Sequence, residues 1–140
     1  MSPPRRFNPD ALKPYAFPWL VPNVGNWSAV WRYTVLVPVQ QVLYDGTVKP
    51  VASEQDLLAL ELMFVEHFGG ITRPPRSLGV GARDPKQPRE TRETNWHEVF
   101  QVYAPQAPAS DQYFQALRFE LQAALVEGQI LIGREDVLLL

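Results

Sequence analysis

One residue type and several sequence patterns are missing from this 140-residue chain, and each absence excludes a class of protein. There is no cysteine, which excludes disulfide bonds, thiolate metal sites and thiol nucleophiles. No apolar run approaches the roughly 20 residues that cross a bilayer, so we expect no membrane partner. Arg5 and Arg6 do not precede an apolar segment, so we expect no secretory signal and a cytoplasmic protein.

The chain also lacks an excess of charge of either sign. It has 13 basic and 15 acidic side chains, a formal net charge of −2 and a pI of about 5.7. This balance argues against attraction of the whole molecule to nucleic acid or to anionic lipid. Its hydrophobic content of 46% is sufficient for one domain, because a chain of about 150 residues buries about two thirds of its surface on folding.

Proline is abundant, and six of the 14 prolines fall within the first 26 residues. Because proline fixes φ and lacks an N–H, this stretch is neither a regular helix nor a central strand. We therefore divide the chain into an N-terminal arm, residues 1–26, and a single domain, residues 27–140. The arm is rich in aromatic residues, unlike most disordered tails, so we expect it to cap the domain. The alternatives are an unstructured tail or an arm that reaches a neighbouring subunit through Phe17 and Trp19.

From residue 27 onward, the spacing of apolar residues predicts alternating strands and helices. The expected elements are strands over 31–39, 71–81, 96–103 and 129–140, and helices over 54–68 and 111–127. Ser53 and Ser110 are the expected N-caps, and glycines are expected to end both helices. The order β-α-β-β-α-β predicts an α+β fold, the ferredoxin-like plait, with two helices on one face of an antiparallel sheet. The alternative is a less regular α+β sheet to which the arm adds a strand.

One face of the sheet is left open in such a plait. If Phe100 and Val102 face the helices, alternation directs His97, Gln101 and Tyr103 to the open face. These three are the candidate ligand-facing residues, and the same face is a candidate surface for pairing with a second sheet. They do not match the consensus by which related sheets bind RNA.

The two histidines are predicted to lie at opposite ends of the sheet. His67 is at the end of the first helix and His97 at the start of the third strand, so a shared metal site within one subunit is excluded. The HExxH, GxSxG and P-loop patterns are absent. We expect no metal, no cofactor and no catalytic residue, which favours a non-enzymatic protein.

Both helices carry more apolar residues than one buried stripe requires. Leu62 and Met63 on the first helix, and Phe119 and Val126 on the second, lie off the core stripes and are candidate interface residues. The arm is the alternative cover for them. Glu61 lies among apolar neighbours, which makes it a candidate buried carboxylate with a raised pKa. The alternative for Glu61 is a position at the edge of the apolar arc, paired with an arginine.

Residues 73–92 carry six basic and two acidic side chains, a local excess of four positive charges. A basic loop neutralises phosphates without reading sequence, although solvated charge is the simpler explanation. The candidate phosphate contacts are Arg73, Arg76, Arg83, Lys86, Arg89 and Arg92.

These patterns favour a small interaction or assembly module that associates with itself or with a protein partner. Two alternatives stay open. The first is a small-molecule-binding protein or enzyme that uses the open sheet face. The second is a nucleic-acid or phosphate binder that uses residues 73–92.

Overall fold

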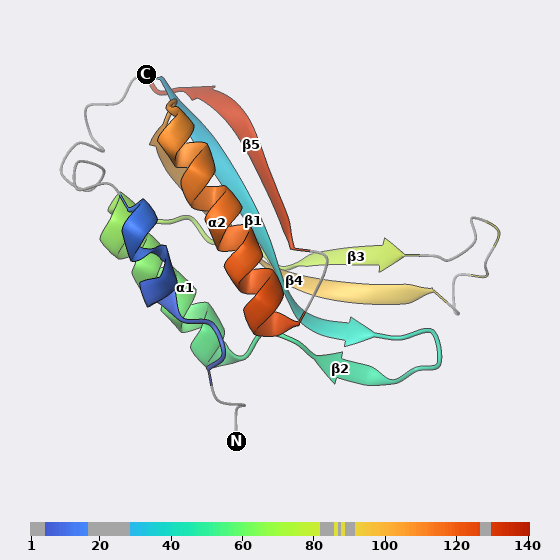
Figure 1. Cartoon of the computed structure of the whole chain (residues 1–140). Coiled ribbons are helices and arrows are strands. Elements are labelled where there is room, and N and C mark those ends of the chain that lie inside the picture. Colours follow the sequence, from blue (N-terminus) through green and yellow to red (C-terminus); the bar gives the residue numbers. More distant parts are fainter. Residues whose placement is uncertain (1–4, 17–28, 82–85, 87, 89–91, 127–129) are drawn as a thin grey trace.

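The computed structural model describes residues 5–16, 29–81, 86, 88, 92–126 and 130–140, which form a mixed α+β structure (Figure 1). One antiparallel sheet of five strands is covered on one face by the three helices of the described residues (Figure 1). The elements are η1 (Pro9–Tyr15), β1 (Ala29–Val42), β2 (Val48–Pro50), α1 (Glu54–Phe68), β3 (Ser77–Gly81), β4 (Glu93–Pro105), α2 (Pro108–Leu125) and β5 (Leu131–Leu138).

The long strands β1 and β4 form the centre of the sheet and pair over nearly their whole lengths. β3 pairs with the start of β4. The other edge of β1 is shared, because β5 lies along Ala29–Leu36 and β2 lies along Gln40–Val42. The register shifts between Pro38 and Gln40, where the partner changes. This bulge also accommodates Pro38, which has no N–H for the ladder.

Alternation along β1 and β4 separates a core face from an open face, as the sequence predicts. Buried side chains of both strands meet the helices on the core face. They are Tyr33, Val35, Val37, Phe100, Val102 and Ala104. Aromatic rings from the helices complete this core, with Phe114 stacked on Tyr33 at 3.8 Å between ring centroids.

The first helix begins and ends where the sequence predicts. Ser53 accepts a hydrogen bond from the backbone N–H of Asp56, and the Asp56 carboxylate accepts one from the N–H of Ser53. This capping box satisfies donors that the first turn leaves free. Gly69 ends the helix with a φ of 84°, a left-handed conformation that glycine adopts without steric cost.

The second helix begins three residues earlier than expected, and Ser110 is not its N-cap. Pro108 occupies the first turn, where its fixed φ suits a helix start, and Ala107 is the N-cap. The Ser110 hydroxyl instead donates to the carbonyl of Pro105 at 2.8 Å. Val126, in a left-handed conformation, follows the last turn. The predicted stop at Gly128 lies outside the described residues.

The part of the arm that the structure describes, residues 5–16, packs on its own domain. The sequence did not predict the 3-10 helix η1 in this segment. Leu12 of η1 and Phe7, which precedes it, are both fully buried. The Asp56 carboxylate accepts hydrogen bonds from the backbone N–H groups of Arg6 and Phe7, both at 2.8 Å. The arm therefore caps the core over this stretch. Phe17 and Trp19 lie outside the described residues.

The sheet is longer than the helix layer that covers it. β1 has 14 residues and rises about 46 Å at about 3.3 Å per residue, whereas the 15-residue α1 spans only about 22 Å. The end of β1, the start of β4 and both short strands therefore project beyond the helices (Figure 1). We call this part the sheet extension, and it comprises Gln40–Val42, β2, β3 and Glu93–His97.

Candidate interaction surface

Eight side chains form one face of the sheet extension, in two rows that cross its four strands. Residues directly opposite one another in an antiparallel pair share a face, so the register defines these rows. Trp96 has the same parity in β4 as Phe100, which places both rows on the side of the helices. The first row is Pro50, Gln40, Trp96 and Leu78, and the second is Val48, Val42, Thr94 and Val80. We call these eight residues the apolar face, since six of them are apolar.

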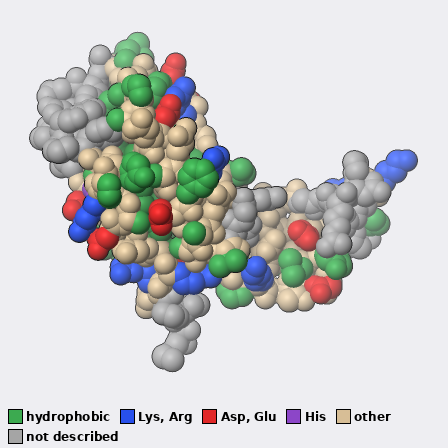
Figure 2. All heavy atoms as spheres, viewed as in Figure 1, with side chains coloured by type: hydrophobic (Ala, Val, Ile, Leu, Met, Phe, Trp, Pro, Cys, Tyr) green, Lys and Arg blue, Asp and Glu red, His purple; other side chains and the backbone are tan. Residues whose placement is uncertain are grey.

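The apolar face is open to solvent in the single chain. Val48 and Val80 are each 55% exposed, Leu78 is 47% exposed and Trp96 is 37% exposed. Figure 2 shows hydrophobic side chains on the projecting part of the molecule, beyond the helices. Single exposed apolar residues are ordinary, but a contiguous apolar patch marks an interaction site.

The reverse face of the sheet extension is polar. Lys49 lies opposite Gln41, which lies opposite Asn95, and Ser77 lies opposite His97. The strands therefore alternate between apolar and polar residues, as in an antiparallel sheet with one buried face. The extension is patterned for burial on the side of the helices, although α1 reaches only its edge with its first turn and the rest of the helix layer lies over the other end of the sheet (Figure 1).

A groove of about 420 Å³ lies where the apolar face meets the first turn of α1. Val48 and Pro50 line it from the extension, and Glu54 and Leu57 line it from the helix. Arg76 borders the same groove. The apolar face thus continues into a concave surface with charged side chains at its margin.

Two of the predicted phosphate contacts, Arg73 and Arg76, form ion pairs with a carboxylate of the same chain. Both donate to the carboxylate of Glu98, with Arg73 Nη2 at 2.6 Å. Arg73 also lies over the ring of Phe100, at 4.1 Å from its centroid. Burial alone would raise the pKa of the Glu98 carboxyl, but the hydrogen bonds from Arg76 and Arg73 hold it below its usual range. These arginines neutralise a carboxylate of the sheet, so they are poorly placed to bind phosphate.

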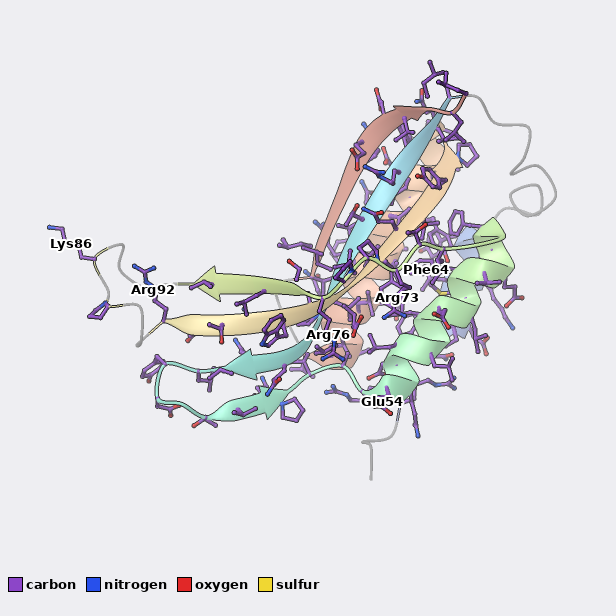
Figure 3. All side chains as sticks on the ribbon, turned by 180° about the vertical axis from the view of Figure 1, so that it is seen from behind. Glu54, Phe64, Arg73, Arg76, Lys86 and Arg92 are labelled. Carbon is purple, nitrogen blue, oxygen red and sulfur yellow. The ribbon has the colours of Figure 1, made fainter. Side chains whose placement is uncertain are left out.

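Glu61 belongs to the same network and is not a buried carboxylate. Its side chain is 39% exposed, and its Oε1 lies 3.3 Å from Nη1 of Arg73. This is the arrangement of an edge residue paired with an arginine. Figure 3 shows Arg73 and Arg76 close to α1, with Lys86 and Arg92 at the far end of the extension. Arg83 and Arg89 lie outside the described residues.

The register directs His97, Gln101 and Tyr103 to the open face, opposite Pro38, Thr34 and Arg32 respectively. His97 is only 9% exposed. A Cβ atom at Gly79 on β3 would lie 3.3 Å from its Cε1. A pocket of about 230 Å³ includes Tyr103 but neither of the other two. This pocket therefore does not gather the predicted ligand-facing residues.

Of the predicted helix-surface residues, Leu62, Phe119 and Val126 are more than half exposed, but Met63 is buried. Met63 lies in line with Leu60 and His67, and this side of α1 faces α2, where Nδ1 of His67 lies 2.7 Å from the Tyr113 hydroxyl. The core arc of α1 is thus displaced toward Met63, which the sequence had placed off it. Its remaining apolar surface is an outer stripe consisting of Leu58, Leu62 and Val65.

A polar cluster between α2 and β5 is satisfied within the chain. The Tyr33 hydroxyl donates to Asp111 at 2.7 Å, and Arg134 Nη1 contacts the other carboxylate oxygen at 2.5 Å. Arg134 also stacks on Trp31, 3.8 Å from the ring centroid. Burial raises the pKa of Tyr33, and the Asp111 hydrogen bond adds to this effect. These contacts hold α2 to the sheet and keep the phenol protonated, which disfavours a role as a base.

Within the described ranges, no group of three or more His, Asp or Glu side chains is arranged to hold a metal ion. Among the helices that the structure describes, none has the length and apolar character to cross a membrane. Comparisons with protein-family models, curated proteins and solved structures give no match to this chain. The apolar face is therefore the most developed candidate site of the described residues, and sequence reasoning missed it. The signal that points to it is the length of the strands relative to the helices.

Proposed function

We propose that this protein is a non-enzymatic interaction module that binds a protein partner through the apolar face of the sheet extension. The observation that carries the proposal is that one side of four paired strands is mainly apolar while the other side is mainly polar. A sheet that served only as a spacer would have polar residues on both sides. Burial of one Val or Leu side chain is worth roughly 1.5–3 kcal/mol, so covering several of them stabilises a complex substantially.

In this proposal the molecule is a ferredoxin-like plait whose central strands continue into the sheet extension, where β3 pairs with the start of β4. β1 and β3 are both antiparallel to β4, which lies between them, and α1 connects them. This connectivity supports the split βαβ arrangement of the plait. The plait hosts many functions, so the fold alone assigns none, and the functional argument depends on the extension.

The first test uses the absence of cysteine, which makes an introduced thiol unique in the chain. Val80→Cys places the thiol on the apolar face, and Ser77→Cys places a matched thiol on the reverse face of the same strand. At nanomolar protein concentration we expect a small thiol reagent to label both variants at similar rates. Much slower labelling of Val80→Cys would mean that the face is covered within its own chain, and the proposal would be wrong.

A stability measurement provides the second readout. Leu78→Thr and Val80→Thr are expected to change the free energy of unfolding by less than about 0.5 kcal/mol, because both side chains are exposed. A loss of about 2 kcal/mol or more would indicate a buried structural role and would contradict the proposal. Urea denaturation of dilute protein makes this comparison.

A further inference from the structure

We propose that the partner is a second copy of this chain, and that the outer stripe of α1 in each copy packs on the apolar face of the other. This inference rests on the proposed function and names its partner. Each chain carries both halves of a helix-on-sheet contact. It has a sheet face that no described helix covers, and a helix stripe that no sheet covers.

The two surfaces agree in dimensions. Leu58, Leu62 and Val65 are spaced as the apolar residues of a helix that buries one side. The stripe is about 10 Å long at 1.5 Å per residue. The apolar face is about 14 Å wide, because four strands are separated by about 4.8 Å each. A helix of this kind therefore fits across the face with all three side chains in contact.

The surface beside the stripe is also hollowed. A depression of about 430 Å³ is lined by Leu58 and Leu62 of the stripe, by Ala59 and Gln55 of α1, and by Arg5 of the arm. Trp96 is the largest side chain of the apolar face and is partly exposed. Inserting it into the depression of a second copy would bury the indole and place it beside the Arg5 guanidinium, a favourable cation–π pairing.

The charges of the two surfaces are complementary. α1 contains four acidic residues and neither Lys nor Arg, and Glu54 and Glu66 are exposed on it. Among the described residues, the sheet extension and the turns at its far end carry three basic side chains, Lys49 on the reverse face, Lys86 and Arg92, against two acidic ones, Asp45 and Glu93. Opposite charges across an interface favour the correct register and speed association.

Reciprocal pairing closes the assembly. If each α1 packs on the sheet extension of the other copy, a two-fold axis relates the two contacts. Both outer stripes and both apolar faces are then covered. The expected product is a dimer, in contrast to an open chain of subunits.

The test measures the solution mass by light scattering over a range of concentrations. Leu62→Lys changes the outer stripe and Val80→Glu changes the apolar face. Both residues are exposed in the single chain, so both variants are expected to fold. Each substitution is expected to raise the dimer Kd by at least about tenfold, because it places a charge in an apolar contact. The matched controls, Gln112→Lys on α2 and Ser77→Glu on the reverse face, are expected to leave the dimer Kd unchanged.

Mixing the two defective variants gives the decisive result. In a mixed dimer, the unchanged stripe of one copy meets the unchanged apolar face of the other, and the second contact gains a Lys–Glu pair. We therefore expect the mixture to form dimers at concentrations where each variant alone is a monomer. The inference is wrong if Leu62→Lys has no effect while Val80→Glu abolishes association, or if the mixture stays monomeric. The inference is also wrong if the unmodified chain is monomeric at all concentrations. The thiol labelling of Val80→Cys and Ser77→Cys tests the proposed function independently of this result.

Discussion

At the scale of single residues, Asp56 connects the arm to the first helix. Its carboxylate is buried and accepts hydrogen bonds from the backbone N–H groups of Arg6, Phe7 and Ser53. Burial alone would raise the pKa of this carboxyl, but the hydrogen bonds from Phe7, Ser53 and Arg6 lower it below the usual value. The capping carboxylate of a helix thus also fixes a segment about 50 residues away in the sequence.

His67 makes stability depend on pH at the same scale. Burial lowers the pKa of its imidazole, an effect that the charge of Glu66 opposes and that of Lys13 reinforces. In the unfolded chain the imidazole takes up a proton near pH 6.5, whereas in the folded protein it binds a proton only at lower pH. The contribution of neutral His67 to the free energy of unfolding is therefore fully present above about pH 6.5 and is lost as the pH falls below it. We expect the free energy of unfolding to fall more between pH 7.5 and 5 in the unmodified protein than in His67→Gln. Equal losses in urea titrations of the two proteins would contradict this assignment.

At the scale of elements, the arm is part of the core. η1 is a short helix with an internal proline, a segment that would not form a stable helix in isolation. It is held by the burial of Phe7 and Leu12 and by the hydrogen bonds to Asp56. The arm therefore closes the helix layer.

Leu12→Ala tests this role of the arm. Because the side chain is fully buried, we expect a loss of about 2–5 kcal/mol in the free energy of unfolding. Tyr15→Ala in the same helix is the control, since Tyr15 is 46% exposed and its truncation is expected to cost less than about 1 kcal/mol. Similar small losses for both variants would show that the arm is not part of the core.

At the scale of the whole molecule, the sheet divides into a body that the helices cover and an extension that they do not. The division follows from geometry, because a strand rises more than twice as far per residue as a helix. Strands as long as β1 and β4 cannot be covered along their length by helices of 15 and 18 residues.

Amide hydrogen exchange is expected to reveal this division. In dilute protein, the amides of β3 should exchange by local opening, faster than those of Tyr33–Val37 in the middle of β1. The difference is expected to shrink as the protein concentration rises, because association covers the apolar face. Equal protection of both regions in dilute protein would mean that the extension is as stable as the body.

The local features of this protein were determined by the sequence itself. Ser53 and Gly69 set the limits of α1, and the alternation of β4 grouped Phe100 with Val102 on one face, because both features depend on residues that are neighbours in the chain. Ser110 was misassigned because Pro108 offered a better helix start nearby. Predictions of this kind succeed where the determining residues are close together in the chain.

Only the tertiary structure decided which surfaces are covered. Glu61 pairs with Arg73 because the chain after α1 turns back toward the sheet, which no pattern in the helix indicates. The apolar face exists because Val48, Trp96 and Val80 belong to two local hairpins, β1–β2 and β3–β4, that are joined by the pairing of β1 with the sequence-distant β4. Each of these residues looks ordinary in its own segment. Their common face depends on the register between strands, which side-chain packing across the whole sheet determines.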